Sequence, residues 1–280
     1  MTRRYQIVHR TLLHYAGPVQ SSHNELRMTP TTEPGQITLE SRLRIRPLTW
    51  SNLYKDHWGT LVTAIEALDG HDVLDIESIS TVERSPLEPA RQHLPWEVLG
   101  GPLVRDLKFE WLMPTPRTHL DAAVHALVDA AAAGLPPGDA VARVAELVRE
   151  RVTYEQGVTG VHSSAQDAWD AGSGVCQDYA HLVLGALRRL GVPSRYVSGY
   201  LNPSRDSAVG DVATGESHAW VEWWDGAWVP LDPTSPDASG LDHVVVARGR
   251  DYDDVPPIKG VFRGADSLGQ TVSVTFTRLA

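Results

Sequence analysis

The sequence predicts an α+β protein, in which an N-terminal β-sandwich-like domain precedes a domain of helices followed by an antiparallel sheet. Three observations carry this prediction. Apolar and polar residues alternate in the first hundred positions, apolar residues recur at helical spacing between positions 120 and 190, and strand patterns return after Pro193. Because the helices are grouped and do not alternate strictly with strands, the pattern is typical of the α+β class.

The N-terminal domain is predicted over residues 1–116. The alternation is clearest in residues 36–46, where one side of an extended chain would carry four apolar residues, Ile37, Leu39, Leu43 and Ile45. Further strands are predicted at 5–15, 61–68 and 73–82, and the Gly, Pro, Asn and Asp residues between them favour an antiparallel sandwich. Prolines and glycines interrupt every regular pattern between residues 86 and 116, so the boundary is placed before Arg117.

The second domain, residues 117–280, is predicted to begin with three helices. The first two span residues 120–133 and 139–152, the latter after an Asp139 N-cap. The third begins near Cys176, ends before a left-handed C-cap at Gly191, and carries an apolar face of Val175, Tyr179, Leu182, Val183, Ala186, Leu187 and Leu190. Strands are then predicted at 195–200, 217–224, 227–231, 244–246 and 271–277.

The composition disfavours several functional classes. The formal net charge of −10 over 280 residues argues against the clustered Lys and Arg of a nucleic-acid-binding surface. No apolar stretch approaches the roughly twenty residues of a membrane span, and none after the basic start is long enough for a signal sequence. We therefore expect no nucleic-acid partner, no membrane association and a cytoplasmic location.

Metal and cofactor sites are not expected either. The single cysteine excludes an internal disulfide and a thiolate-rich metal site. The twelve histidines form no HExxH motif, and the acidic run at residues 251–254 lacks the glycine and the terminal glutamate of a calcium loop. We interpret that run as a solvated loop.

Cys176 is the candidate nucleophile. Without context a lone cysteine is usually a small buried apolar residue, but Gly172, Ser173 and Gly174 stand directly before this one and the predicted helix begins at it. Unpaired N–H groups at the positive end of a helix favour a thiolate, by about 0.3–1 kcal/mol and up to ~2 kcal/mol in good geometry. A free thiol with a reference pKa of about 8.5 needs more than that to ionise at neutral pH, so a histidine must supply the rest.

His218 is the best candidate for that histidine. His162, His181 and His243 are alternatives, but His181 lies five residues along the helix from Cys176 and so falls on a different face. His218 stands in a predicted strand that runs into the turn signal Asp225-Gly226, after which a second strand ends before Asp232. The hairpin would bring His218 close to Asp232.

The register of this hairpin decides whether the two side chains can touch. A two-residue loop at Asp225-Gly226 would put Asp232 on the opposite face from His218. A three-residue loop from Trp224 to Gly226, with Gly226 left-handed, would place His218 directly across from Asp232. We prefer the three-residue loop because glycine suits that position. Taken singly, His218 could be a satisfied core histidine and Asp232 a turn residue, but a thiol, a histidine and an aspartate together match the nucleophile, base and orienting group of thiol acyl-transfer enzymes.

These residues also resemble a known family. Three segments carry the resemblance to the transglutaminase-like superfamily, in its bacterial form with an N-terminal β domain: Gly174-Val175-Cys176-Gln177-Asp178-Tyr179-Ala180-His181-Leu182, Ser217-His218-Ala219-Trp220-Val221-Glu222 and Leu231-Asp232-Pro233-Thr234. Residues 243–257 resemble the family's C-terminal segment and are interpreted as framework without chemistry. The resemblance implies a papain-like or transglutaminase-like core and a Cys176-His218-Asp232 triad.

The expected function is thiol-dependent acyl transfer on a protein or peptide substrate. Resemblance to a superfamily with many bacterial proteases favours hydrolysis by a cysteine peptidase or amidase, while transfer to an amine by a transglutaminase remains open. A non-enzymatic protein-binding scaffold is the alternative of another class, and the intact triad argues against it. The backbone N–H of Cys176 is a candidate oxyanion donor, with Gln177 and Trp169 as guesses for the second donor.

Overall fold

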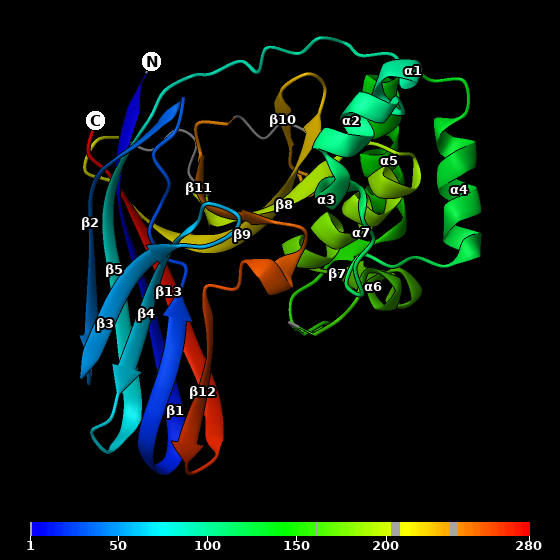
Figure 1. The fold of residues 1–280 in the computed structure, drawn as a ribbon. Coiled ribbons are helices and arrows are strands. Elements are labelled where there is room, and N and C mark those ends of the chain that lie inside the picture. The colour runs from blue at the N-terminus through cyan, green and yellow to red at the C-terminus, as the bar shows by residue number, and fades with distance from the viewer. Residues whose placement is uncertain (1, 161, 203–207, 236–239) are drawn as a thin grey trace.

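The fold places strands on one side and helices on the other (Figure 1). A computed structural model of the chain describes residues 2–160, 162–202, 208–235 and 240–280. It contains a large, mainly antiparallel sheet of 11 strands together with several helices, which confirms the α+β class. The boundary before Arg117 stays a prediction.

The four strands predicted in the N-terminal region are present. They are β1 (Arg3–Leu26), β2 (Gln36–Arg46), β4 (Leu61–Ala67) and β5 (His71–Arg84), and an additional strand, β3 (Trp50–Lys55), pairs with β4. Strand β1 is much longer than predicted, because its first half pairs with β5 and its second half pairs with β4. A cluster of buried side chains joins these strands: Tyr15, Val19, Leu26, Met28, Ile65, Ala67, Leu74 and Ile76.

The expected single apolar face of β2 is wrong. Leu43 and Ile45 pack against that cluster, whereas Ile37 and Leu39 are about half exposed, at 47% and 51%. The pairing of β2 with β5 shifts register between Thr38 and Glu40. One extra residue at such a bulge turns every following side chain to the opposite face.

Helices begin earlier than predicted. The proline-rich connection contains three short helices, α1 (Trp96–Leu99), α2 (Pro102–Leu107) and α3 (Phe109–Leu112). Helix α4 (Ala122–Ala132) is capped by Asp121, which accepts from Val124 N–H, and α5 (Pro137–Arg151) begins two residues before the predicted Asp139 cap, with Pro136 at the N-cap. Proline at the first helical position loses no hydrogen bond, which explains the early start.

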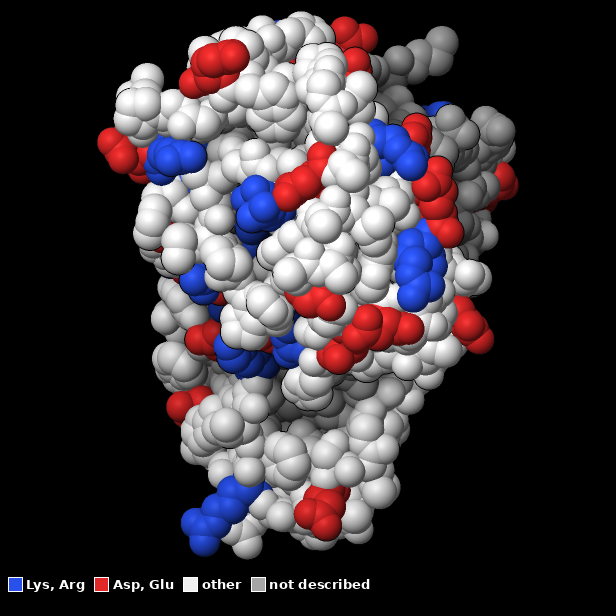
Figure 2. Space-filling view, turned by 90° about the vertical axis from the view of Figure 1, so that its right-hand side faces the viewer, with Lys and Arg blue, Asp and Glu red and all other residues white. Residues whose placement is uncertain are grey.

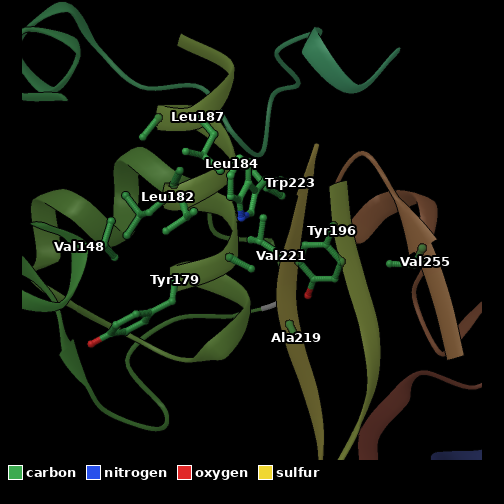
Figure 3. Close-up of a cluster of buried hydrophobic side chains, with 14 of the residues drawn as sticks. Val148, Tyr179, Leu182, Leu184, Leu187, Tyr196, Ala219, Val221, Trp223 and Val255 are labelled. Carbon is green, nitrogen blue, oxygen red and sulfur yellow. The ribbon is translucent and has the colours of Figure 1, made fainter. Parts of the chain in front are cut away.

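Helix α7 (Cys176–Arg189) forms the centre of the second half of the molecule. Gly191 adopts the predicted left-handed conformation with φ 78°, and Val192 N–H donates to Leu187 O at 2.9 Å. Every residue from Gln177 to Arg188 is buried, not one face alone, because the sheet covers one side of α7 while α4, α5 and α6 (Ala165–Ala171) cover the other. Figure 3 shows Leu182, Leu184 and Leu187 among the side chains packed toward Val221 and Trp223.

The sheet beside α7 continues into the N-terminal strands. It contains β8 (Ser194–Leu201), β9 (Val212–Trp224), β10 (Trp228–Leu231) and β11 (His243–Gly249), followed by a 3-10 turn, η1 (Tyr252–Asp254), and by β12 (Ile258–Gly264) and β13 (Ser267–Arg278). Strand β13 lies between β9 and β1, so that Val274 pairs with Gly215 on one edge and with His9 on the other. Both ends of the chain therefore contribute to one sheet.

Candidate functional site

Cys176 is the first residue of α7, and its position is held by the turn before it. The carboxylate of Asp178 accepts from Val175 N–H at 2.8 Å and from the Thr159 hydroxyl at 2.6 Å. A Cβ at Gly174 would lie 2.8 Å from Asp178 Cβ, so this position requires glycine. The thiol is partly exposed and lies at a helix N-terminus, as the sequence predicts.

Cys176 opens onto a cleft of about 250 Å³. The walls of the cleft come from the start of α7, the β8–β9 pair, the β11–β12 connection, and the strands β1 and β13. In that order, the lining residues are Val175 and Gln177; Tyr196, Ser198, Ser217, His218 and Ala219; Tyr252, Pro257 and Ile258; and His9, Thr11, Gln270 and Val272. One wall therefore belongs to the terminal strands of the chain. Burial lowers the pKa of His9 in that wall to about 4, so its imidazole is neutral.

His218 and Asp232 form a buried pair beside Cys176. His218 Nε2 lies 2.8 Å from Asp232 Oδ2, and Asp232 Oδ1 accepts from the backbone N–H of Thr234 at 2.9 Å and from its hydroxyl at 2.7 Å. Burial alone would lower the pKa of His218, but its hydrogen bonds with Asp232 and Cys176 raise that pKa to about 10. Burial alone would raise the pKa of Asp232, and hydrogen bonds from His218 and His243 instead hold it well below its usual range.

The hairpin that joins these residues has a three-residue loop, but the predicted register is wrong. Trp224 pairs with Trp228, so the loop consists of residues 225–227 and the pairing is displaced by two residues from the expected one. Gly226 is left-handed with φ 78°, as predicted. A displacement of two residues keeps the side chains on the same faces, so Asp232, just beyond the end of β10, still reaches His218.

His243, which the sequence offered only as an alternative base, contacts Asp232 instead, and the sequence interpretation missed this contact. It begins β11 and pairs with Leu201 of β8, and its Nε2 lies 2.9 Å from the same Asp232 Oδ2 that contacts His218. The interpretation of residues 243–257 as framework without chemistry stays a prediction, to which the structure adds this contact of His243 with Asp232. Among the described residues, the ligand atoms of His218, Asp232 and His243 lie within 4.8 Å of one another. The Nε2 atoms of His218 and His243 both lie at hydrogen-bond distance from Asp232 Oδ2. Hydrogen bonds between the two histidines and the carboxylate therefore explain why the three side chains lie together.

Tyr154 lies beside the nucleophile as well. Strand β6 (Thr153–Tyr154) runs parallel to β7 (Ser173–Gly174), and Tyr154 pairs with Gly174, two residues before Cys176. The phenol interacts with the side chain and the backbone N–H of Cys176, and burial together with the charges of Cys176 and Glu216 raises its pKa. The phenol therefore stays protonated.

Comparisons with known proteins identify the family. A sequence model of the transglutaminase-like superfamily matches residues 125–233, and a model of the bacterial transglutaminase-like N-terminal region matches residues 5–83. An uncharacterized protein of Mycobacterium leprae is 41% identical over 277 residues, covering 99% of both chains. The chain belongs to the transglutaminase-like superfamily.

Two further relatives extend the comparison within the superfamily. A solved structure of a Cytophaga hutchinsonii protein, described as a candidate cysteine protease, superposes with a TM-score of 0.78 at 20% identity, covering 98% of this chain and 90% of that one. A protein-glutamine gamma-glutamyltransferase of Pseudomonas aeruginosa is 35% identical over 88 residues, which are 29% of this chain and 13% of the relative. The first comparison shows a shared fold.

The remaining candidate residues lie in different surroundings within this superfamily core. Gln177 lines the cleft, whereas Trp169 packs in the hydrophobic core and does not line it. His181 is buried, accepts from Tyr252 N–H at 3.2 Å, and burial lowers its pKa to about 3. His162 is exposed and contacts Arg117. These positions agree with the rejection of His181 as the base.

A second hollow of about 600 Å³ reaches Asp232 and His243 from the other side of the sheet. Its wall includes the buried carboxylate of Glu222, which pairs with Arg195 and with Arg248. Asp232 thus lies between two hollows, the cleft that contains Cys176 and the second hollow that His243 lines.

The charges on the surface and the lengths of the helices are relevant to the expectation of no nucleic-acid partner and no membrane association. On the face drawn in Figure 2, basic side chains are interspersed with acidic ones. Across the described part of the chain, no helix has both the length and the apolar character needed to cross a membrane. The absence of a nucleic-acid partner stays a prediction.

Proposed function

We propose that this member of the transglutaminase-like superfamily is a thiol-dependent acyl-transfer enzyme that acts on peptide or carboxamide bonds. Cys176 is the nucleophile, His218 the base and Asp232 the group that orients His218. The observation that carries this proposal is the 2.8 Å hydrogen bond between His218 and Asp232, both buried, beside a thiol that opens onto a cleft. Nucleophile, base and orienting group in this order form the arrangement of thiol acyl-transfer enzymes.

The charge states of the three residues suit the first step of the reaction. With its pKa raised to about 10, His218 is an imidazolium at neutral pH, the form that can stabilise a thiolate at Cys176. The thiolate attacks the substrate carbonyl, and the backbone N–H of Cys176, which contacts the Tyr154 phenol in the structure, is the proposed donor to the developing oxyanion. His218 then donates its proton to the departing amine, which leaves a thioester on Cys176.

The second step returns the enzyme to its starting state. Neutral His218 accepts a proton from an incoming water, the resulting hydroxide attacks the thioester carbonyl, and the acid product leaves as Cys176 is released as a thiolate. Asp232 accepts from His218 Nε2 throughout, which leaves Nδ1 to face Cys176 and stabilises the imidazolium. Gln177 is better placed than Trp169 to supply a second oxyanion donor, because Gln177 lines the cleft.

Hydrolysis is the proposed outcome, and transfer to an amine is the second candidate. The 35% identity over 88 residues to a protein-glutamine gamma-glutamyltransferase favours the second candidate. A non-enzymatic scaffold would not need a buried His218–Asp232 pair beside the thiol. The proposed substrate is a protein or peptide, with no cofactor, and the cytoplasmic location stays a prediction.

The first test is intact mass spectrometry after incubation with a broad panel of peptide amides. Wild type is expected to gain an acyl group that is absent from Cys176→Ala, and a panel-wide absence of the adduct would contradict acyl transfer. Adding a primary amine then separates the two outcomes. Free acid as the sole product at high amine concentration supports hydrolysis, and formation of the substituted amide supports transglutamination.

A further inference from the structure

We propose that His218, Asp232 and His243 form a regulatory site for a divalent transition-metal ion of the zinc type, which enters through the second hollow. The ion binds His218 on Nε2, the ring nitrogen that points away from Cys176. The binding of the ion stands on geometry alone. Its effect on catalysis rests on the proposed function, because it concerns the proton that His218 must donate.

The three side chains offer the donor atoms that zinc prefers. Zinc sites in proteins combine imidazole nitrogens with carboxylate oxygens, usually in a tetrahedral arrangement. Among the residues that the structure describes, His218, Asp232 and His243 are the one group of three histidine, cysteine or acidic side chains whose ligand atoms lie within 4.8 Å of one another. All three are buried, so the cluster differs from the solvated acidic groups that are common on protein surfaces.

The distances between the donor atoms require only a small rearrangement. The Nε2 atoms of His218 and His243 lie 2.8 and 2.9 Å from Asp232 Oδ2. Bonds of about 2.0–2.2 Å to one tetrahedral ion place two ligand atoms roughly 3.3–3.5 Å apart, so the carboxylate oxygen has to withdraw by roughly 0.5 Å from each ring. The ion replaces the protons that join the rings to the carboxylate, so the hydrogen-bonded state and the metal-bound state use the same atoms.

Two further hydrogen bonds hold the carboxylate in an orientation that suits a ligand. Asp232 Oδ1 accepts from the backbone N–H of Thr234 at 2.9 Å and from its hydroxyl at 2.7 Å. The other oxygen, Oδ2, therefore faces the two rings and is the one that can bind the ion. Hydrogen bonds to a ligating carboxylate orient it and strengthen metal binding.

The second hollow provides a route for the ion and a place for water. It has a volume of about 600 Å³ and is lined by both Asp232 and His243, whereas neither residue lines the cleft that contains Cys176. Zinc with three protein ligands normally keeps a further position for water, and a hollow of this size has room for one. The charges of the described wall residues balance, because besides Asp232 they include three arginines and three glutamates: Arg84, Arg195, Arg248, Glu33, Glu88 and Glu222.

A bound ion should slow catalysis by occupying Nε2 of His218. In the proposed mechanism, His218 donates the proton on Nδ1 to the departing amine. With a metal ion on Nε2, loss of that proton would leave an imidazolate, so the ring becomes a much weaker acid than the imidazolium. We therefore expect metal binding to lower kcat while Cys176 stays open to the cleft.

Zinc titration of the Cys176→Ala protein tests the site without any catalysis. Calorimetry should give one ion per chain with a Kd of about 1–100 µM, weaker than a structural zinc site because the ion must displace protons. Adding His243→Gln should weaken binding at least about tenfold, because glutamine can still donate to Asp232 but offers no imidazole nitrogen. The matched control is His119→Gln, which removes an exposed histidine and should leave the Kd unchanged. Absence of zinc binding, or binding that does not depend on His243, would overturn the inference.

Cobalt spectra and thiol labelling distinguish this site from a metal ion bound to Cys176. Cobalt(II) on nitrogen and oxygen ligands should give visible d–d bands in wild type without a thiolate-to-cobalt charge-transfer band. Zinc-loaded wild type should react with iodoacetamide at a rate within about threefold of the metal-free protein, because the ion lies on the far side of His218 from the thiol. A charge-transfer band that Cys176→Ala abolishes, or protection of the thiol by zinc, would place the ion in the cleft and refute the proposed site.

Inhibition kinetics complete the test and separate the two proposals. With a peptide amide that acylates Cys176, zinc should lower kcat in wild type, and His243→Gln should raise the zinc concentration for half inhibition at least about tenfold. Binding through His243 without inhibition would remove the regulatory role. If no peptide acylates Cys176 but the Cys176→Ala protein binds zinc through His243, the proposed function fails and the metal site stands. If acylation occurs and zinc does not bind through His243, the inference fails and the proposed function stands.

Discussion

His243 Nε2 lies 2.9 Å from Asp232 Oδ2, the oxygen that also accepts from His218. The carboxylate is thus fixed from two sides, by one histidine in β9 and one in β11. His243 does not line the cleft that contains Cys176, so its effect on chemistry must pass through Asp232.

We expect His243→Phe to weaken the enzyme while preserving the ring contacts with Trp220. Removal of one hydrogen bond to a buried carboxylate costs about 1.5–3 kcal/mol of folding free energy, and a less firmly held Asp232 should lower kcat by about tenfold. Thermal unfolding and kcat on an acylating peptide measure the two effects. His181→Phe is the matched control, because His181 is equally buried but does not contact Asp232. A shared loss of kcat in both variants would count against a positioning role for His243.

Removal of the base should be visible in cysteine alkylation. In wild type, iodoacetamide should react with Cys176 well below pH 8, because the imidazolium of His218 stabilises the thiolate. His218→Ala should slow the reaction at pH 6 by at least about tenfold, while the rate at pH 10 changes little. Asp232→Asn, which keeps the size of the side chain, should lower kcat by roughly 10²–10⁴. Equal rates for wild type and His218→Ala at pH 6 would remove the ion pair from the mechanism.

The stability of the protein should fall as the pH rises above neutrality. The folded-state pKa of His218, about 10, exceeds its unfolded value of about 6.5, so its contribution is complete below pH ~6.5 and is lost as the pH rises toward 10. Asp232 has the opposite sign, because its depressed pKa adds stability above pH ~4 that is lost on acidification. Thermal midpoints from pH 6 to 10 should therefore decline more steeply in wild type than in His218→Gln. Parallel curves would contradict the raised pKa.

The glycine before the helix is expected to be indispensable. Gly174→Ala would bring a methyl group within 2.8 Å of Asp178 Cβ, and the resulting shift should destabilise the fold by about 1–3 kcal/mol and displace Cys176. Gly70→Ala serves as the control, since a Cβ there would have no neighbour within 4 Å. Chemical denaturation and iodoacetamide labelling of both variants provide the measurements. A Gly174→Ala protein as stable and reactive as Gly70→Ala would disprove the steric argument.

Periodicity and motifs predicted α4, α5 and α7, most strands and the neighbourhood of His218 and Asp232, because each depends on residues close in sequence. The shorter helices α1, α2, α3 and α6 were not predicted. The errors concern the register of strand pairing, in the β2–β5 pair and in the β9–β10 hairpin. The bulge at Thr38 and Glu40 turned Ile37 outward, and the hairpin loop moved by two residues while preserving the face of Asp232. Alternation of polar and apolar residues specifies a face but not the partner strand.

Contacts between distant segments could not be predicted from local patterns. His243 offers no signal of its own, since a histidine at the start of a strand is compatible with many surroundings. The pairing of β13 with both β9 and β1 depends on the whole sheet, and so does the contribution of His9 and Val272 to the cleft.

The place of β13 between β1 and β9 also determines when the cleft can form during biosynthesis. Strand β1 leaves the ribosome long before β13 and keeps an open edge until β13, the last of the described strands, has been made. Pairing over such a sequence distance is slow, because the intervening chain loses much conformational entropy before the contact forms. A nascent chain that already contains Cys176, His218 and Asp232 therefore lacks one wall of the cleft until β13 has been made.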